Sequence, residues 1–317
     1  MGRGGVMETM AVVLSAPERL TLSRLDLLPP ADEDIVVEVE FSGISTGTER
    51  LFFNGNMPPF PGMGYPLVPG YESVGRVTFA GPLSGRSENE RVFCPGAVCF
   101  KDVRGLFGGA ASKIVLPGKR AIPVDPKWED RAALLALAAT AQHALGAGPS
   151  PDLIVGHGVL GRLLARLCLV AGGEAPTVWE TNAARRAGAD GYRVIHPDED
   201  KRRDYRTICD VSGNGASLDR LISCLAPRGE IVLAGFYSEP LSFAFPPAFM
   251  REARLRVAAE WREPDLAAVT RMIAAGRLSL DGLITHRRDA ADANDAYRIA
   301  FGNSDCLKVV LDWRSCR

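Results

Sequence analysis

The chain has 317 residues, a formal net charge of -1 and 46% hydrophobic residues. This length is too great for one small core and predicts two domains. The near-zero charge gives no electrostatic reason to expect nucleic acid or an anionic membrane surface as a partner. No apolar run reaches the about 18–20 residues that a membrane-spanning helix needs.

The first nine residues, Met1 to Thr9, are rich in glycine and lack the apolar centre of a signal peptide. We expect a disordered extension there, or a true start at Met7 or Met10. The seven cysteines form neither a paired framework nor a CxxC motif. This usage is typical of a reducing compartment, so a cytoplasmic location is expected.

Residues 10–125 are predicted to be mostly β. Apolar and alternating runs indicate strands at 10–14, 34–41, 72–77, 90–93 and 112–116. The segment from Leu51 to Pro69 is rich in proline, glycine, phenylalanine and methionine, and predicts a long irregular loop. Residues 128–145 predict a helix that leads into a second domain.

From Asp152 onward, strands and helices alternate, which predicts a parallel sheet. The number of strands matches a doubly wound dinucleotide fold. The expected strands are 152–155, 176–179, 192–195, 207–211, 229–234 and 255–261. Helices at 264–275 and 290–301 and a strand at 307–312 follow, and we expect them to return to the first domain. The predicted division places 10–127 and 263–317 in one domain, and 128–262 in the other.

The most informative stretch is a GxGxxG turn between a predicted strand and a predicted helix. Its residues are Gly156, His157, Gly158, Val159, Leu160 and Gly161. The first glycine permits a tight turn, the second lets a pyrophosphate approach the backbone, and the third lets helix and strand pack closely. The phosphates would lie at the positive end of the helix dipole. His157 is expected to contribute its backbone to this phosphate cradle.

Glu180 ends the next strand, about 20 residues beyond the turn, where a carboxylate accepts hydrogen bonds from the adenosine ribose hydroxyls. This position favours NAD as the cofactor. Arg185 and Arg186 are placed to receive the 2′-phosphate of NADP, but Glu180 would repel that phosphate. Ser212 and Gly235 follow two later predicted strands and complete the predicted nucleotide site.

Several local signatures resemble the medium-chain dehydrogenase/reductase superfamily. The run Gly70-Tyr71-Glu72-Ser73-Val74-Gly75 is similar to its Gly-His-Glu-x-x-Gly motif. The segment from Gly43 to Glu49 resembles its Gly-Ile-Cys-x-Thr-Asp segment with one extra residue, and Leu283 to His286 resembles the stretch before its last helix. The resemblance implies an α/β chain with a β-rich GroES-like catalytic domain and an inserted Rossmann domain built on a doubly wound parallel sheet.

Longer stretches resemble one narrow group in that superfamily, the 3-hydroxyethyl bacteriochlorophyllide a dehydrogenases of bacteriochlorophyll biosynthesis. These stretches are 45–50, 57–72, 178–182 and 234–253. The similarity extends from Met10 to Arg314. It implies an enzyme that oxidises the 1-hydroxyethyl group on ring A of the macrocycle to acetyl and passes a hydride to NAD. The implied partner is a small-molecule tetrapyrrole substrate.

The chain departs from the zinc-dependent members of the superfamily, which bind the catalytic metal with two cysteines and a histidine. Thr46 stands near the first cysteine position, Tyr71 replaces the histidine, and Thr140 stands near the second cysteine position. Hydroxyls are poor zinc ligands beside thiolate and imidazole. Cys94 and Cys99 alone cannot form the four-cysteine structural site. We therefore expect no metal.

Without zinc, a side chain or a water chain must take the hydroxyl proton of the alcohol. Tyr71 is the candidate donor and acceptor, Thr48 is the candidate relay hydroxyl, and Glu72 would orient them or accept the proton. The alternative is structural. Tyr71 then fills the space left by the histidine, Thr48 bonds its own turn, and Glu72 pairs with an arginine.

A flat apolar macrocycle needs an apolar surface, and the loop after residue 51 offers one. The predicted substrate-lining residues are Phe52, Phe53, Met57, Phe60, Met63 and Tyr65. The same side chains would also suit an ordinary loop core. His143, on the predicted helix near Thr140, either faces the nicotinamide or is a satisfied core histidine. His286 is expected to be structural.

Two other functions fit the same motifs. One is a zinc-independent quinone or enoyl reductase, and the other is a nucleotide-sensing protein that binds its cofactor without turnover. Hydride transfer from an alcohol to NAD distinguishes the dehydrogenase from both. The aromatic stretch from Phe236 to Met250, beside the expected edge of the cofactor sheet, predicts a homodimer.

Overall fold

The computed structural model describes residues 7–59 and 61–316, and its contacts separate two compact units. Unit 1 comprises Met1–Ala136 and Ile284–Arg317, and unit 2 comprises Leu137–Leu283. The division expected from the sequence lay near residues 128 and 263. The helix that begins at Glu263 belongs instead to unit 2, because its Asp265 bonds His143 of the same unit.

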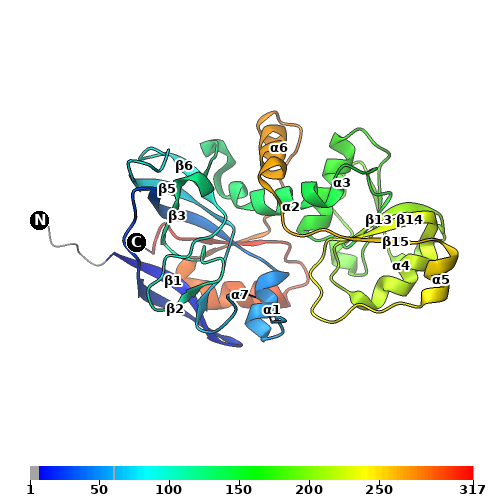
Figure 1. Ribbon diagram of the computed structural model, residues 1–317, viewed down its shortest axis with the longest axis horizontal. Helices are drawn as coiled ribbons and strands as arrows, with labels where there is room; N and C mark the ends of the chain where they lie inside the picture. The colour runs from blue at the N-terminus through cyan, green and yellow to red at the C-terminus, as the bar shows by residue number, and fades with distance from the viewer. Residues whose placement is uncertain (1–6, 60, 317) are drawn as a thin grey trace, which may run out of the picture. The chain divides into compact units, whose positions relative to one another are not determined.

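Unit 1 contains two β-sheets (Figure 1). One has the strand order β2-β1-β4-β7, and the other has the order β16-β17-β3-β5-β6-β9 with β8 paired to β3. The strands are β1 (Glu8–Ala16), β2 (Arg19–Asp26), β3 (Asp34–Ile44), β4 (Leu67–Val68), β5 (Ser73–Ala80), β6 (Arg91–Cys94), β7 (Arg104–Gly105), β8 (Lys113–Pro117), β9 (Ile122–Pro123), β16 (His286–Asp289) and β17 (Val309–Asp312). Since β17 pairs antiparallel with β3, the end of the chain completes the first unit.

The start of β1 corrects one expectation. Glu8 pairs with Asp26 and Thr9 with Leu25 across β1 and β2, so residues 8 and 9 belong to a strand and not to an extension. The rest of the predicted extension, apart from Met7, lies outside the described residues.

Two helices of unit 1 frame the region discussed below. They are α1 (Thr48–Asn54) and α7 (Ala293–Gly302). The composition of Leu51 to Pro69 predicted an irregular loop, and most of α1 lies at the start of that segment. The helix was missed because two turns are too short to show a clear period. The buried residues of α7 recur every three or four positions and so lie on one face of the helix; they are Ala293, Ala296, Tyr297 and Ala300. Tyr297 packs into the core formed by both sheets. The remaining helical turns are η1 (Gly118–Arg120), η2 (Pro126–Leu134) and η6 (Ala290–Asp292).

Unit 2 contains a six-stranded parallel sheet with the order β12-β11-β10-β13-β14-β15. The strands are β10 (Leu153–Val155), β11 (Thr177–Trp179), β12 (Arg193–Ile195), β13 (Tyr205–Asp210), β14 (Leu225–Leu233) and β15 (Arg254–Val257). Its helices are α2 (Leu135–Leu145, which begins in unit 1), α3 (Val159–Val170), α4 (Leu218–Cys224), α5 (Phe245–Met250) and α6 (Glu263–Ala274), with the turns η3 (Ala183–Arg185), η4 (Pro197–Glu199) and η5 (Gly215–Ser217).

Numbered from its first strand, this sheet has the order 3-2-1-4-5-6, which defines the doubly wound dinucleotide fold. In Figure 1, α3 lies on one face of the sheet, and α4 and α5 lie on the other. The strand order reverses between β10 and β13, and this reversal opens a crevice at the carboxyl ends of the strands. The predicted fold class, a GroES-like β-rich unit with a Rossmann unit, is confirmed.

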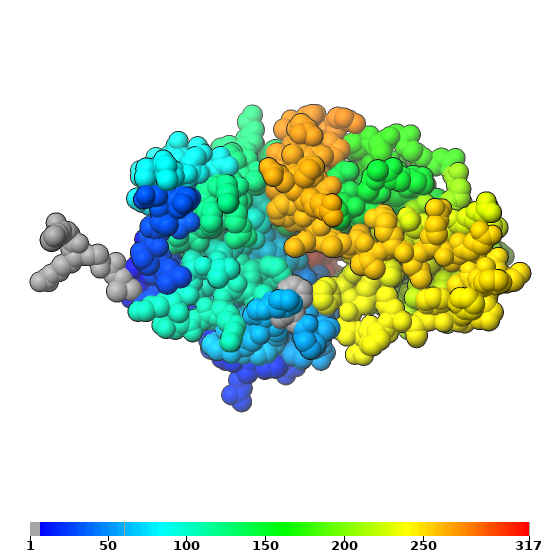
Figure 2. All heavy atoms as spheres, in the orientation of Figure 1, coloured from blue at the N-terminus to red at the C-terminus, as the bar shows by residue number. Residues whose placement is uncertain are grey.

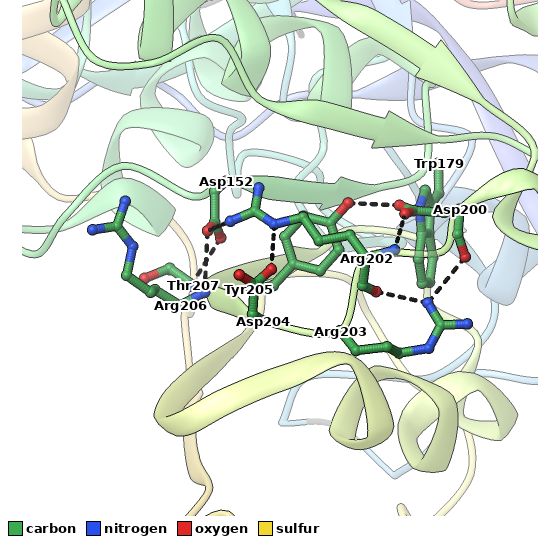
Figure 3. Close-up of polar contacts among 9 residues, drawn as sticks. All are labelled: Asp152, Trp179, Asp200, Arg202, Arg203, Asp204, Tyr205, Arg206 and Thr207. Atoms are coloured by element: carbon green, nitrogen blue, oxygen red, sulfur yellow. Dashed lines mark hydrogen bonds and ion pairs between the residues drawn. The ribbon is translucent and has the colours of Figure 1, made fainter.

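A polar network anchors β11, the strand that carries Glu180 at its end (Figure 3). The buried Trp179 indole donates to Asp200 Oδ2 at 2.6 Å, and the Tyr205 hydroxyl donates to the same oxygen at 2.6 Å. Asp152, just before β10, accepts from the backbone N–H of Thr207 at 3.0 Å. These bonds join β10, β11 and β13, so the residue that follows Trp179 has a fixed position.

Candidate active site

The glycine turn of unit 2 has the geometry that its sequence predicts. β10 ends at Val155, and Gly156 has a φ of +103°, in the region that favours glycine. A Cβ at Gly161 would collide with the carbonyl oxygen of Gly156, so only glycine lets α3 pack this closely against the turn. α3 begins at Val159 with Gly158 as its N-cap, and no side chain of the described residues caps it. The first N–H groups of the helix are thus available for an anionic ligand.

Glu180 lies beside this turn in a fixed orientation. Its Oε2 accepts from the backbone N–H of His157 at 3.0 Å, and its Oε1 accepts from the backbone N–H of Asn182 at 2.8 Å. A carboxylate oxygen has further lone pairs, so both oxygens can still accept from ribose hydroxyls. The same contact corrects one prediction. The N–H of His157 is taken by Glu180 and does not belong to the phosphate cradle, which leaves that role to Val159, Leu160 and Gly161.

The His157 side chain is fully buried and holds the segment that follows β11. Its Nδ1 lies 2.6 Å from the carbonyl oxygen of Arg185, which can only accept, so Nδ1 carries the proton. Its Nε2 therefore accepts from the Tyr192 hydroxyl, at 2.8 Å. Burial lowers the pKa of His157 to about 4, so the ring is neutral at physiological pH. This imidazole therefore links the glycine turn to Arg185 and Tyr192.

Two arginine side chains make polar contacts at the segment that follows β11. The Arg162 guanidinium donates to the carbonyl oxygens of His157, Arg185 and Ala187 at 3.1, 3.0 and 2.8 Å. Arg186, a predicted partner of a 2′-phosphate, lies 3.7 Å from a carboxylate oxygen of Glu199. The backbone of Arg185 is thus held firmly beside the turn, and Arg186 is engaged by an acid.

Ser212 and Gly235 lie at the same edge of the sheet as the glycine turn. Ser212 N donates to Asp210 Oδ1 at 2.8 Å, and Gly235 N donates to the Asp210 carbonyl oxygen at 3.0 Å. A Cβ at Gly156 would lie 3.5 Å from Ser212 Cα, which shows how closely these strand ends approach. Asp210 was not among the predicted residues. Burial raises its pKa, and its Oδ2 accepts from the Tyr237 hydroxyl at 2.9 Å. The fold brings the predicted residues together at the carboxyl ends of the strands of this sheet.

Unit 1 gathers three hydroxyl groups, Ser45, Thr48 and Tyr71, which we call the hydroxyl cluster. The Tyr71 hydroxyl donates to Ser45 Oγ at 2.7 Å and has a hydrogen bond with Thr48. Burial, followed by the charge of Glu72, raises the pKa of Tyr71, so its phenol keeps its proton. The predicted pair Tyr71 and Thr48 is thus in direct contact. Ser45 was missed, although it lies in the quoted Gly43–Glu49 segment.

Glu72 does not have the predicted arrangement. Its carboxylate is fully buried, and Lys308 Nζ lies 2.7 and 2.9 Å from its two oxygens. Lys308 also donates to the carbonyl oxygen of Ile44 at 3.1 Å. The Glu72 carboxylate is therefore paired with an ammonium, and the Tyr71 hydroxyl donates to Ser45 and not to Glu72, which favours the structural interpretation of Glu72. The structural alternative was closer, except that the partner is a lysine and not an arginine.

A second buried carboxyl, Glu49, was not singled out from the sequence. Its Oε2 accepts from the Tyr297 hydroxyl at 2.7 Å, and its Oε1 accepts from the backbone N–H of Ser45 at 3.1 Å. Burial raises the pKa of Glu49 to about 7, against the opposing effect of these two hydrogen bonds. An acid at the end of the Gly43–Glu49 segment was the one available signal.

The predicted substrate-lining aromatic residues lie mainly in the core of unit 1. Phe52 is fully buried, so its predicted role as a substrate surface is wrong. Phe53 is partly buried and packs against the ring of Phe301 at a centroid distance of 5.3 Å. The Tyr65 hydroxyl donates to the carbonyl oxygen of Phe52. Phe60 lies outside the described residues.

The remaining histidine candidates are satisfied by neighbours. His143 Nδ1 lies 2.8 Å from Asp265 Oδ2, which joins α2 to α6 within unit 2 and favours the structural interpretation. His286 Nδ1 lies 2.9 Å from the neighbouring Thr285 Oγ1.

The donor set of the described residues offers no metal site. Over residues 7–59 and 61–316, no group of three or more histidine, cysteine, aspartate or glutamate side chains is arranged to hold a metal ion. Cys94 and Cys99 are buried, and burial raises the pKa of their thiols to about 12 and about 11. Within the same residues, every helix is too short or too polar to span a bilayer.

Solved structures share this fold at low sequence identity. An alcohol dehydrogenase from Escherichia coli CFT073, solved with NADH, matches with a TM-score of 0.81 and 20% identity, and the match covers 97% of this chain and 100% of that one. The 2R,3R-butanediol dehydrogenase of Bacillus subtilis matches with a TM-score of 0.82 and 16% identity over 96% of this chain and 99% of that one.

Curated proteins match far more closely, although no model of a protein family matches the chain. The 2-desacetyl-2-hydroxyethyl bacteriochlorophyllide A dehydrogenase of Cereibacter sphaeroides is 58% identical over 317 residues, which cover 98% of this chain and 99% of that protein. The protein of the same name from Rhodobacter capsulatus is 56% identical over 314 residues, with 98% and 100% coverage. At this identity over almost the full length, the chain belongs to the 2-desacetyl-2-hydroxyethyl bacteriochlorophyllide A dehydrogenase family.

Proposed function

We propose that this chain oxidises the 3-(1-hydroxyethyl) group on ring A of a bacteriochlorophyllide precursor to acetyl, with NAD as the hydride acceptor. The observation that carries the proposal is 58% identity over 98% of the chain to a dehydrogenase named for a hydroxyethyl bacteriochlorophyllide. In this oxidation the carbinol C–H bond breaks as a hydride and the O–H bond breaks as a proton. The chain must therefore bind a dinucleotide and guide one proton.

The glycine turn from Gly156 to Gly161 and the nearby Glu180 can bind NAD. When bound, NAD would supply the nicotinamide carbon that accepts the hydride. The N-terminus of α3 offers uncapped N–H groups to a pyrophosphate, and Glu180 is held by two backbone N–H groups where it can accept from the ribose hydroxyls. These residues bind and orient the nucleotide, and the anchored β11 keeps Glu180 in register.

The hydroxyl cluster offers a path for the proton that leaves the substrate hydroxyl. The Tyr71 oxygen would accept a hydrogen bond from the substrate hydroxyl while its own O–H donates to Ser45 Oγ at 2.7 Å. As the substrate O–H bond breaks, its proton would move to the phenol oxygen and the phenol proton to the Ser45 or Thr48 hydroxyl. That hydroxyl would release its own proton to a water chain that leads to solvent. Because burial raises the pKa of Tyr71, the phenol passes a proton on and does not store a negative charge.

The direct test combines purified protein, NAD and a 3-(1-hydroxyethyl) bacteriochlorophyllide. We expect equimolar NADH and 3-acetyl product, from protein that contains well below one zinc per chain. Consumption of NADPH with a quinone or an enoyl substrate, and no alcohol oxidation, would indicate the reductase instead. Nucleotide binding without turnover of any substrate would indicate the sensor.

We expect NAD to be preferred over NADP because of Glu180. Replacing Glu180 with Ser should weaken NAD binding by about 1–3 kcal/mol, the scale of a charge-assisted hydrogen bond, and should improve NADP. Dissociation constants for both nucleotides measure this directly. The Glu180→Gln variant is the matched control, since it keeps an acceptor oxygen and removes the charge that repels the 2′-phosphate. Tighter binding of NADP by the unmodified protein would contradict the proposal.

We also infer that two copies of the chain associate through β15. This strand is the last in the sheet order, and Val257 on it is 77% exposed. The segment around residues 236–257, yellow in Figure 2, lies at the surface and presents Phe249 and Met250 at 65% and 76% exposure. An edge strand that exposes apolar side chains such as Leu255 and Val257 can pair with a second copy about a two-fold axis. Sedimentation should give the mass of a dimer, and Val257→Lys should give a monomer. A monomer at micromolar concentration without the substitution would refute the inference.

A further inference from the structure

One buried cluster of unit 1 contains two carboxyls and a single ammonium. Glu49 and Glu72 are both fully buried carboxyls, and Lys308 is the buried ammonium beside them. Lys308 Nζ contacts both oxygens of Glu72. The donors that reach Glu49 are the Tyr297 phenol and the Ser45 amide, which are both neutral. If all three groups ionise, one negative charge is left over, with no opposite charge beside it in a buried region. The desolvation free energy of that charge disfavours the ionised form of Glu49.

Glu49 is also linked to Tyr71 through the hydroxyl cluster. Ser45 lies between them, because its Oγ accepts from the Tyr71 hydroxyl at 2.7 Å and its backbone N–H donates to Glu49 at 3.1 Å. Thr48, the other partner of Tyr71, directly precedes Glu49 at the start of α1. Glu49 thus bonds the backbone of one partner of the phenol and is the chain neighbour of the other.

We propose that Glu49 is a positioning residue for the alcohol oxidation, which orients Ser45 and Thr48 around Tyr71 and whose ionisation promotes loss of the substrate proton. This inference rests on the proposed function. Glu49 acts through Tyr71 and does not exchange a proton with the substrate. The Tyr297 hydroxyl on α7 holds the carboxylate from the opposite side.

The direction of the effect follows from the groups that face Glu49. They are Glu72 and Lys308 behind it, Tyr297 on α7, and Tyr71 across Ser45. An ionised Glu49 makes the region near Tyr71 more negative, which favours arrival of a proton on the phenol oxygen. Since burial raises the pKa of Glu49 to about 7, the carboxyl changes charge near neutral pH. Oxidation should therefore accelerate as the pH rises through this value.

The test is the pH dependence of kcat, measured with saturating NAD and 3-(1-hydroxyethyl) bacteriochlorophyllide. The unmodified protein should show an inflection near the pKa of Glu49. Glu49→Gln should lose that inflection and should be about tenfold slower above it, the effect of about one pKa unit on the neighbouring proton transfer. Its KM for NAD should not change. Tyr297→Phe should move the inflection to higher pH, because the Tyr297 hydrogen bond lowers the pKa of Glu49.

Glu88→Gln is the matched control, since Glu88 is an exposed glutamate of the same unit, and its profile should equal that of the unmodified protein. An unchanged inflection in Glu49→Gln would overturn the inference, as would an equal loss of kcat at every pH. A protein that never oxidises the alcohol would refute the proposed function instead. In that case the urea midpoint decides whether Glu49 carries the leftover charge. As the pH rises from about 5 to 8, the urea midpoint should fall in the unmodified protein and should stay constant in Glu49→Gln. A parallel fall in both proteins would overturn the inference.

Discussion

Replacing Tyr71 with Phe should lower the turnover number for alcohol oxidation by about 10²–10⁴-fold, the usual scale of assistance by a positioned acid or base. The substitution keeps the ring, which packs edge-on against Phe107 at a centroid distance of 5.1 Å, and removes only the hydroxyl that donates to Ser45. Folding and NAD affinity should therefore be retained. Turnover must be compared at saturating substrate, because a change confined to KM would indicate binding and not proton transfer.

Tyr205→Phe provides the matched control for that experiment. It removes another phenol hydroxyl, whose 2.6 Å hydrogen bond to Asp200 belongs to the network that anchors β11. This control should lose stability and keep its turnover number. A loss below about tenfold in Tyr71→Phe would leave Tyr71 as a space-filling residue. The proton path would then depend on Thr48 or on water.

Replacing Lys308 with Met should lower the free energy of unfolding by about 3–5 kcal/mol, because it leaves the Glu72 carboxylate buried without its partner. Lys308 and Glu72 are both buried, so water cannot replace the lost ammonium. Urea unfolding followed by circular dichroism measures the change. The double variant Lys308→Met with Glu72→Gln should recover most of the loss, since it removes the uncompensated charge together with its partner.

The exposed pair Arg24–Glu8 gives a matched control for the buried one. Its ion pair has a similar length of 2.8 Å, but the two side chains are 69% and 46% exposed. Arg24→Met should therefore change the free energy of unfolding by less than about 1 kcal/mol. If Lys308→Met cost no more than Arg24→Met, the buried pair would not stabilise the junction of β5, β17 and β3.

The geometry of the glycine turn could be predicted because its requirements are local. The strand at 153–155, the turn through Gly156 and Gly161, and the helix from Val159 follow one another directly in the chain. Each glycine is demanded by backbone geometry at its own position, and Glu180 is set by the length of one strand–helix–strand unit. The same local reasoning did not predict that the N–H of His157 donates to Glu180 or that its side chain bonds Tyr192, because only the folded chain brings these residues near.

The residues that surround the Tyr71 hydroxyl could not be predicted in the same way. The sequence pointed to Tyr71 and Thr48 through a motif, but it did not predict the pairing of Glu72 with Lys308, and it assigned no role to Glu49 or Ser45. Tyr297 lies 248 positions from Glu49 along the chain, and Lys308 lies 236 positions from Glu72. No periodicity or spacing connects residues so far apart.

The sequence by itself therefore determined the two-unit architecture, the Rossmann turn and the family, because these depend on periodic burial, on glycine geometry and on residue identity. Only the tertiary structure decided which carboxyl is neutralised by an ammonium and which keeps a leftover charge. The physical reason is that the cost of a buried charge is set by its neighbours in space. Those neighbours come from α7 and from the strand that the end of the chain adds to β3.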